Sequence, residues 1–256
     1  MRPRGGIFGK NVLPSLYGGA SGCWTLREQE AYARDLIWPV NVLVYDTFTA
    51  SNGTAISGRT PSPRANGANT WSTATWSGDG NVAACQIQNN QAQQTTYASS
   101  TYNSFSHVYC NCGTSDVTVS ATCVIGSRDG SYSYCGPIAR FTTYGGNFGG
   151  SFIIAQIISN NLGSVGIGYS LFLRSFNAGS VTTLASSSVA IAYDTPYVVT
   201  LKCAGSNITA TWNGVTLTGT STVNQTVTSH GFCIGHTDDK GSGAQTYVDN
   251  LSISAP

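Results

Sequence analysis

NITATWNGVTLT, at residues 207–218, carries a complete β-hairpin signal: two runs of alternating apolar and polar residues joined by Asn213 and Gly214. Asn-Gly is the preferred dipeptide of the type I′ turn, whose twist suits a two-residue antiparallel hairpin. This turn fixes the register and sets Trp212 opposite Val215. One face of the hairpin is apolar and the other is a row of threonines, so we predict one face on a core and the other in water.

Short runs of this kind recur from Val40 to the C-terminus, interrupted about every 8 to 12 residues by Gly, Asn, Ser or Pro. The run SFIIAQIIS (151–159) is apolar on both faces around Gln156, which predicts a strand in the middle of its sheet. The run DVTVSATCVI (116–125) predicts a half-buried strand whose inward residues are Val117, Val119, Ala121, Cys123 and Ile125. The sequence therefore predicts an all-β, antiparallel β-sandwich over residues 40–256.

Composition and charge argue against several classes of partner. The 256 residues have a formal net charge of +1, and their only basic cluster is Arg2, Arg4 and Lys10. Nucleic-acid binding needs many phosphate contacts, so it is not expected. No stretch approaches a membrane span, and the N-terminus lacks the apolar region of a secretory signal. We therefore expect no membrane insertion and synthesis in a cytosol.

The sequence has eight cysteines, which we interpret mainly as small buried apolar residues kept reduced in the cytosol. Cys110 and Cys112 would share one face of a strand, a spacing unlike that of zinc knuckles. Later closure of a pair such as Cys112 with Cys123 stays open as an alternative. The full set is Cys23, Cys85, Cys110, Cys112, Cys123, Cys135, Cys203 and Cys233.

The N-terminal 39 residues differ from the rest. Residues 1–22 are rich in Gly and Pro with isolated apolar residues, which predicts an extended arm or a frayed tail. A short helix is predicted over residues 26–36, because Thr25 and Glu28 have the spacing of a capping box. Its apolar stripe is narrow, and such a helix is marginal alone. We therefore expect residues 1–39 to dock on a neighbouring subunit or on a different protein.

Catalytic residues are not predicted. Glycoside hydrolysis on a β-sandwich needs two carboxylates across a cleft, yet no glutamate follows Glu30 and the aspartates are scattered. The three histidines lie far apart, and no nucleophile elbow accompanies them. We expect no enzyme activity.

Asp46 and Asp249 are the most informative acids because both fall on otherwise apolar strand faces. A buried carboxylate costs several kcal/mol unless it is paired or hydrogen-bonded. We expect structural acids that share an arginine or backbone N–H groups, with Ca²⁺ as the alternative partner and no other cofactor. In the run TYVDNLSIS (246–254) the residues expected to point inward are Tyr247, Asp249, Leu251 and Ile253.

Three aromatic residues are candidates for glycan contact: Trp71, Trp76 and Tyr97. An aromatic face packs well on a pyranose ring. Trp71 and Trp76 are five residues apart, hence on opposite faces of a straight strand, so at most one of them points outward. Core packing is the alternative for each.

The segment from Asp46 to the end resembles concanavalin A-like and laminin G-like jelly rolls, in which the first and last strands lie side by side. The residues that carry this resemblance are VYDTF (44–48), the hairpin region from Tyr197 to Leu217, GFCIGHT (231–237) and YVDNLSI (247–253). Residues 89–150 match no part of these jelly rolls, and their Tyr, Ser and Cys content would suit an insertion. The resemblance implies a jelly-roll β-sandwich.

A second resemblance covers SGCWTLREQEAYARDLIWP, residues 21–39. It is similar to a segment near the N-terminus of tail and other virion proteins of bacteriophages, where a Trp, a Leu-x-Glu-Gln helix and a final Trp-Pro precede a variable β-rich domain. The resemblance implies attachment to the particle through a set of anchor residues: Trp24, Leu26, Glu28, Gln29, Trp38 and Pro39.

Together these observations predict a virion structural protein, namely a tail, fibre or surface-decoration subunit. Residues 1–39 would attach it to other virion proteins, and a jelly roll over 40–256 would be displayed. Particle symmetry favours a homo-oligomer. The alternative is a carbohydrate-binding module for a host surface glycan, and a glycoside hydrolase is the least favoured function.

Overall fold

The structure, a computed structural model, describes residues 42–64, 69–77, 84–94, 103–127, 132–143, 147–160, 168–188, 191–237 and 245–255. The predicted arm and helix, with all the anchor residues, lie outside these ranges, as does Tyr97. Within them the chain is almost entirely β, and the helical element is a 3-10 turn, η1 (Asn147–Gly149). No helix in these ranges has the length and apolar character to cross a membrane.

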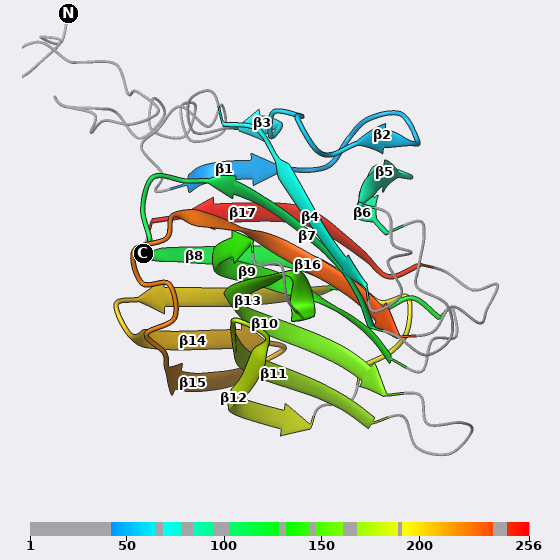
Figure 1. The fold of residues 1–256 in the computed structure, drawn as a ribbon. Coiled ribbons are helices and arrows are strands. Elements are labelled where there is room, and N and C mark those ends of the chain that lie inside the picture. Colours follow the sequence, from blue (N-terminus) through cyan, green and yellow to red (C-terminus); the bar gives the residue numbers. More distant parts are fainter. Residues whose placement is uncertain are drawn as a thin grey trace, which may run out of the picture. The chain divides into compact units, whose positions relative to one another are not determined.

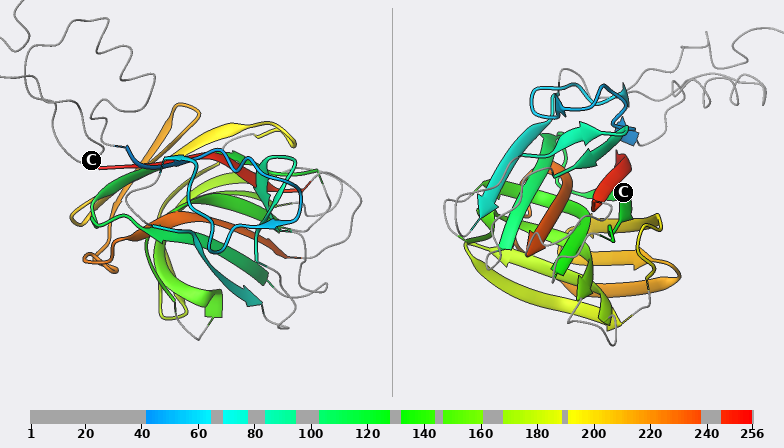
Figure 2. Two further views of the ribbon diagram at one scale, coloured as in Figure 1. Left: turned by 90° about the horizontal axis from the view of Figure 1, so that it is seen from above. Right: turned by 90° about the vertical axis from the view of Figure 1, so that its right-hand side faces the viewer.

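The described strands form two stacked sheets (Figures 1 and 2). The seven-stranded sheet, in front in Figure 1, has the order β12-β11-β10-β9-β16-β7-β4. The ten-stranded sheet behind it has the order β15-β14-β13-β8-β17-β6-β5-β2, and β1 pairs with both β17 and β3. Neighbouring strands along both paths are antiparallel. This confirms the predicted all-β antiparallel sandwich.

The seven-stranded sheet consists of β4 (Ser72–Ser77), β7 (Asn103–Asn111), β9 (Tyr132–Thr143), β10 (Gly150–Asn160), β11 (Gly168–Asn177), β12 (Ser180–Ser188) and β16 (Ser229–Thr237). The ten-stranded sheet consists of β1 (Val42–Asp46), β2 (Thr54–Ala55), β3 (Pro63–Arg64), β5 (Gln86–Gln88), β6 (Gln91–Gln93), β8 (Val117–Val124), β13 (Tyr197–Ala204), β14 (Asn207–Trp212), β15 (Val215–Thr220) and β17 (Tyr247–Ser254).

The main core lies between the two sheets. The predicted inward face of β8 is buried, whereas Thr118, Ser120 and Thr122 on its other face are partly exposed. Seven cysteines lie among the described residues and all are buried, and Cys110 Sγ lies 3.8 Å from Cys112 Sγ. Burial raises the pKa of the Cys85 and Cys203 thiols to about 12, which keeps them protonated and unreactive.

The hairpin at β14 and β15 has the predicted register, with Trp212 paired to Val215. Asn213 and Gly214 have φ values of 45° and 80°, as a type I′ turn requires. Replacement of Gly214 by alanine is expected to lower the free energy of unfolding by about 1 kcal/mol, because a Cβ disfavours this left-handed backbone. Chemical denaturation measures the change. Asn213→Gly is the control and should be nearly neutral; equal losses in both variants would contradict this account.

The strands that the structure describes within residues 89–150 belong to the two sheets of the sandwich and do not form an insertion. β7 and β9 flank β16 inside the seven-stranded sheet, and β8 lies between β13 and β17 in the ten-stranded sheet. The treatment of this segment as an insertion is therefore wrong. The expected neighbourhood of first and last strands is confirmed, since β1 pairs with β17.

The inward residues of the last strand are only partly as predicted. Val248, Leu251 and Ile253 are buried, whereas Tyr247 and Asp249 are partly exposed. The pairing of β17 with β8 shifts register between Asp249 and Ser252, and Asn250 has a φ of 47°. This β-bulge places two consecutive residues opposite one and reverses the faces of the residues before it.

Candidate functional site

The outer face of the seven-stranded sheet, which points away from the ten-stranded sheet, carries a second hydrophobic cluster. We call it the aromatic face. Its buried members are Phe105, Tyr134, Ile138, Phe141, Phe152, Ile154, Ile158, Phe176 and Cys233, and the partly buried residues packed against them are Ala74, Trp76, Tyr109, Phe148 and Phe172. Strand β10 is consequently buried on both of its faces, which explains its apolar sequence.

Phe148 connects the edge of the aromatic face to its centre. Its ring centroid lies 5.7 Å from that of Trp76, 5.4 Å from that of Phe105 and 5.1 Å from that of Phe176. The backbone of Phe148 is in the left-handed region, with φ 68° and ψ 4°. Such a conformation is unfavourable for a bulky residue and persists only where packing over-determines it. The ring contacts supply that packing.

Small residues beside the large rings let the sheet carry so many aromatic side chains. A Cβ at Gly235 would lie 2.0 Å from the ring of Tyr134, and one at Gly149 would lie 2.9 Å from Cβ of Trp76. Glycine at these two positions therefore makes room for the rings that cover them.

Four aromatic side chains of this face are only partly buried: Trp76, Tyr109, Phe148 and Phe172. They rest on the buried rings beneath and beside them, so their orientation is fixed before any ligand arrives. Stacking of an apolar sugar face on such a pre-positioned ring loses little side-chain entropy. The aromatic face is therefore the candidate binding surface.

His107 lies inside this cluster and is fully buried. Its ring is stacked parallel to Phe105, with centroids 5.9 Å apart, and contacts Phe141 and Phe152 at 4.8 and 4.9 Å. Burial lowers the pKa of His107 to about 3. At neutral pH it is therefore an uncharged member of the aromatic packing, with a structural role.

Arg174 is the charged residue of the aromatic face among the described positions. Its guanidinium carbon lies 3.8 Å from the ring centroid of Phe172. Nη1 donates to Oε1 of Gln156 at 3.2 Å, and Nε donates to Oγ1 of Thr183 at 3.4 Å. These contacts hold the guanidinium over the ring of Phe172.

Carboxylates are absent from the seven strands of this sheet, as their sequences show. The described aspartates are Asp46, Asp116, Asp194 and Asp249, and all lie outside the sheet. A pair of carboxylates flanking a bound sugar is therefore not formed by these residues, although retaining and inverting hydrolases both need one.

Asp46 is fully buried at the end of β1, on the opposite side of the core from the aromatic face. Its Oδ1 accepts the backbone N–H of Phe48 at 2.8 Å, while Oδ2 accepts from Trp71 Nε1 at 2.6 Å and Arg59 Nη1 at 2.5 Å. The guanidinium of Arg59 occupies the place that a divalent cation would need. The residues around Asp46 therefore do not fit a Ca²⁺ site.

Asp249 is partly exposed and has hydrogen-bond donors of its own. Its carboxylate oxygens accept from the backbone N–H and the side-chain amide of Asn250, at 2.7 and 3.0 Å. The structure thus gives the two acids separate donors instead of a shared partner. Within the described residues, no group of three His, Cys, Asp or Glu side chains is placed to hold a metal ion.

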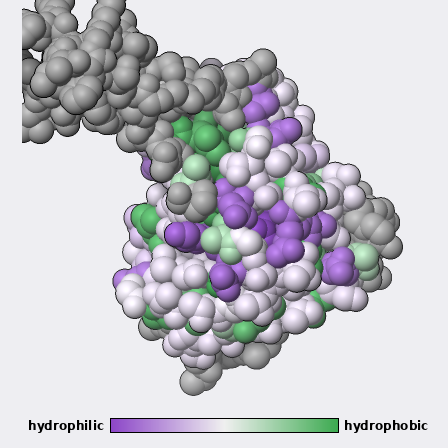
Figure 3. Space-filling view, turned by 90° about the vertical axis from the view of Figure 1, so that its left-hand side faces the viewer, coloured by the Kyte–Doolittle hydropathy of each residue, from purple (hydrophilic) through white to green (hydrophobic). Residues whose placement is uncertain are grey.

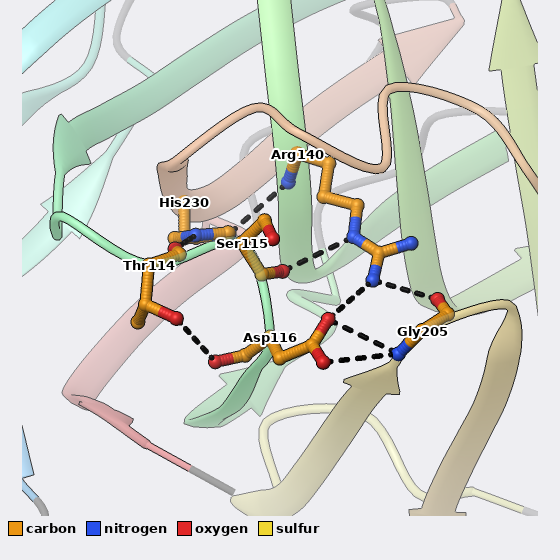
Figure 4. A network of polar contacts seen from close by, with 6 residues as sticks. All are labelled: Thr114, Ser115, Asp116, Arg140, Gly205 and His230. Carbon is orange, nitrogen blue, oxygen red and sulfur yellow. Dashed lines mark hydrogen bonds and ion pairs between the residues drawn. The ribbon is translucent and has the colours of Figure 1, made fainter.

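A polar network ties the two sheets together at the end of the sandwich seen in Figure 3, where hydrophilic residues gather across the middle of the view. Arg140 of β9 has no exposed side-chain surface and reaches across to the loops of the ten-stranded sheet (Figure 4). Its Nε donates to the Ser115 carbonyl at 3.1 Å, and Nη2 donates to the Gly205 carbonyl at 2.7 Å and to Asp116 Oδ1 at 2.9 Å.

His230 completes the network on the other side of Arg140. The backbone N–H of Arg140 donates to His230 Nδ1 at 3.1 Å, and His230 Nε2 lies 2.8 Å from the Thr114 carbonyl. This pattern assigns the neutral tautomer with the proton on Nε2. Burial lowers the pKa of His230 to about 4. The network is therefore a structural clamp built from one arginine, one half-exposed aspartate and a neutral histidine.

Among the predicted glycan-contact residues, the structure separates the two tryptophans. Trp71 is 1% exposed and packs in the main core, whereas Trp76 is partly exposed on the aromatic face. The prediction that they occupy opposite faces is confirmed. Sequence reasoning missed Phe148, Phe172 and Arg174. The alternation of Phe172, Arg174 and Phe176 in β11 was the available signal.

No protein-family model and no curated protein matches the chain. Among solved structures, the CBM2 module of the evolved Dit of Lactobacillus casei BL23 phage J-1 is 8% identical with a TM-score of 0.53, covering 83% of this chain and 94% of the module. The exoplasmic/lumenal domain of VIP36, in a Ca²⁺/Man-bound form, is 10% identical with a TM-score of 0.50, covering 84% and 90%. These similarities show that the chain shares its two-sheet β-sandwich fold with these two domains.

Proposed function

We propose that this chain is a non-catalytic, glycan-binding structural subunit of a bacteriophage particle. Residues 1–39 attach it to other virion proteins, and the lectin-like sandwich is displayed for contact with a host surface glycan. The observation that carries the binding role is the aromatic face, where partly exposed rings rest on a buried aromatic layer. Because the strands beneath this face supply no carboxylate, it suits binding better than hydrolysis.

The carbohydrate part of the proposal predicts a specific loss. Trp76→Ala is expected to weaken glycan binding about five- to thirtyfold, because a stacking ring worth about 1 to 2 kcal/mol is removed. A glycan array identifies the ligand, and titration calorimetry then measures the affinity of the variant. Val198→Ala is the matched control, since Val198 is 60% exposed on the other sheet. Equal losses of affinity in both variants would contradict the role of the aromatic face as the glycan-binding surface.

The virion part rests on the resemblance of residues 21–39 to phage attachment segments. It is supported by the fold, which this chain shares with a module of a phage Dit protein over most of both lengths. Trp24 and Trp38 act as anchors in a groove of a neighbouring subunit, and the oligomer follows the particle's symmetry. The chain is then located in the virion.

Replacement of both Trp24 and Trp38 by alanine is expected to remove most of the chain from assembled particles, since aromatic anchors commonly contribute about 2 kcal/mol or more each. The amount of chain that co-sediments with particles measures incorporation. Trp76→Ala, which leaves the attachment segment intact, should incorporate normally. Normal incorporation of the double variant would contradict attachment through residues 21–39.

A further inference from the structure

Arg174 is a cation on the aromatic face, and none of the acidic residues that the structure describes forms an ion pair with it. The ion pairs formed in the described part of the chain are Arg59 with Asp46 and Arg140 with Asp116, and Arg174 belongs to neither. Its hydrogen bonds to Gln156 and Thr183 go to neutral oxygens and use two of the five guanidinium donors. The remaining donors are available to a ligand.

Neighbouring side chains fix the position of the Arg174 guanidinium. Its guanidinium is stacked on Phe172, and the amide that fixes it, Gln156, is 2% exposed in the middle of β10. Burying an amide side chain in an otherwise apolar strand is unfavourable unless it gains a partner, and Arg174 is that partner. Partial burial lowers the pKa of Arg174, which indicates a positive charge whose lost hydration the protein does not fully replace.

Arg174 is also continuous with the stacking surface. It lies two residues from Phe176 on the same face of β11, and Phe176 contacts Phe148, which in turn contacts Trp76. A sugar chain resting on Trp76 and Phe148 would therefore run toward the guanidinium. The strands of this sheet contain no carboxylate that would repel an anionic sugar chain, so the formal charges that they carry are positive.

We propose that the aromatic face selects anionic glycans, and that Arg174 binds the acidic group through charge-assisted hydrogen bonds while the partly exposed rings stack on neighbouring sugar units. The acidic group is a carboxylate of a uronic acid or a phosphate of a polyol-phosphate polymer. Both accept the planar, two-pronged hydrogen bonds of a guanidinium. This inference rests on the proposed glycan-binding function and adds its ligand class.

The test uses the full chain and three probes. Polygalacturonate oligomers present the carboxylate, the same oligomers with fully methyl-esterified carboxyl groups remove the charge, and a poly(glycerol phosphate) chain presents the phosphate. We expect the wild-type chain to bind one of the two acidic probes at least about tenfold more tightly than the ester, since a hydrogen bond to a charged group contributes about 1.5 to 3 kcal/mol. The preference should shrink as salt increases.

The variants separate charge selection from fold and from stacking. Arg174→Gln is expected to lose the acidic preference while keeping the affinity for the methyl ester, and Arg174→Lys should retain part of it because the charge remains. Trp76→Ala should weaken binding of the polygalacturonate oligomers and of their methyl esters alike, because both present the same sugar rings. Circular dichroism and thermal unfolding show whether each variant stays folded.

The outcomes distinguish this inference from the proposed function. Binding of the ester as tightly as of both acidic probes, or an Arg174→Gln variant that keeps the acidic preference, overturns the inference and leaves the glycan-binding function standing. Failure to bind any glycan on a broad array that includes neutral sugars overturns both.

Discussion

Replacement of Arg140 by methionine is expected to lower the free energy of unfolding by about 3 to 5 kcal/mol. The side chain has no exposed surface and supplies the donors for the carbonyls of Ser115 and Gly205. Methionine fills much of the volume but donates no hydrogen bond, so both carbonyls lose a partner at the junction of the two sheets. Denaturant unfolding of both proteins measures the loss.

Asp116→Asn is the matched control for the Arg140 variant. The Asp116 side chain is 42% exposed, so water replaces part of what the ion pair provides, and we expect a loss of only about 1 kcal/mol. If the two substitutions cost the same, the clamp depends on the ion pair and not on the buried guanidinium and its carbonyl partners.

Acid is expected to destabilise the sandwich through its buried neutral histidines. Burial lowers the pKa of His107 to about 3 and that of His230 to about 4, against an ordinary value near 6.5. The folded state therefore binds fewer protons than the unfolded state. The stability contributed by each neutral ring is complete above about pH 6.5 and is lost as the pH falls toward 4 for His230 and 3 for His107.

The slope of the free energy of unfolding against pH measures the contribution of a single histidine when a variant without that histidine is compared with the wild type. Between about pH 6 and pH 4 each neutral histidine contributes up to about 1.4 kcal/mol per pH unit. His107→Phe keeps an aromatic ring beside Phe105 and Phe141 but cannot be protonated. Denaturant unfolding at several pH values should give a slope smaller by about one proton in this variant. An unchanged slope would show that His107 is not neutral and buried in the folded state.

The parts of the fold predicted correctly are those decided by local sequence. Asn213 and Gly214 fix one turn type, and the turn fixes the register of β14 and β15 without help from the rest of the chain. The alternation in β8 works in the same way, because one buried face and one hydroxyl-rich face leave a single favourable orientation.

The errors arise where backbone geometry departs from a regular strand. The bulge at Asn250 reverses the faces of Tyr247 and Asp249, and nothing in the alternation signals an extra residue. Phe148 and Arg140 both have positive φ, at 68° and 58°, although neither is a glycine or an asparagine. Their roles depend on partners distant in sequence, which a local pattern cannot supply.

The sequence predicted only part of the candidate site, again because its residues have partners that are distant in sequence. Trp76 was singled out as an aromatic residue that could point outward, but Phe148, which its ring contacts, comes from a turn far along the chain, and Phe172 comes from a strand farther on. The apolar residues on both faces of β10 correctly indicated a central strand. They did not indicate that aromatic rings, instead of a covering helix, bury its second face.

The pairing of β1 with β17 brings the entry and the exit of the sandwich to the same end, as the views from two directions show (Figures 1 and 2). A domain whose two ends lie close together can be inserted into another protein, or removed from it, without straining the backbone of that protein. The sandwich can therefore be transplanted as a cassette into a surface loop of an unrelated scaffold.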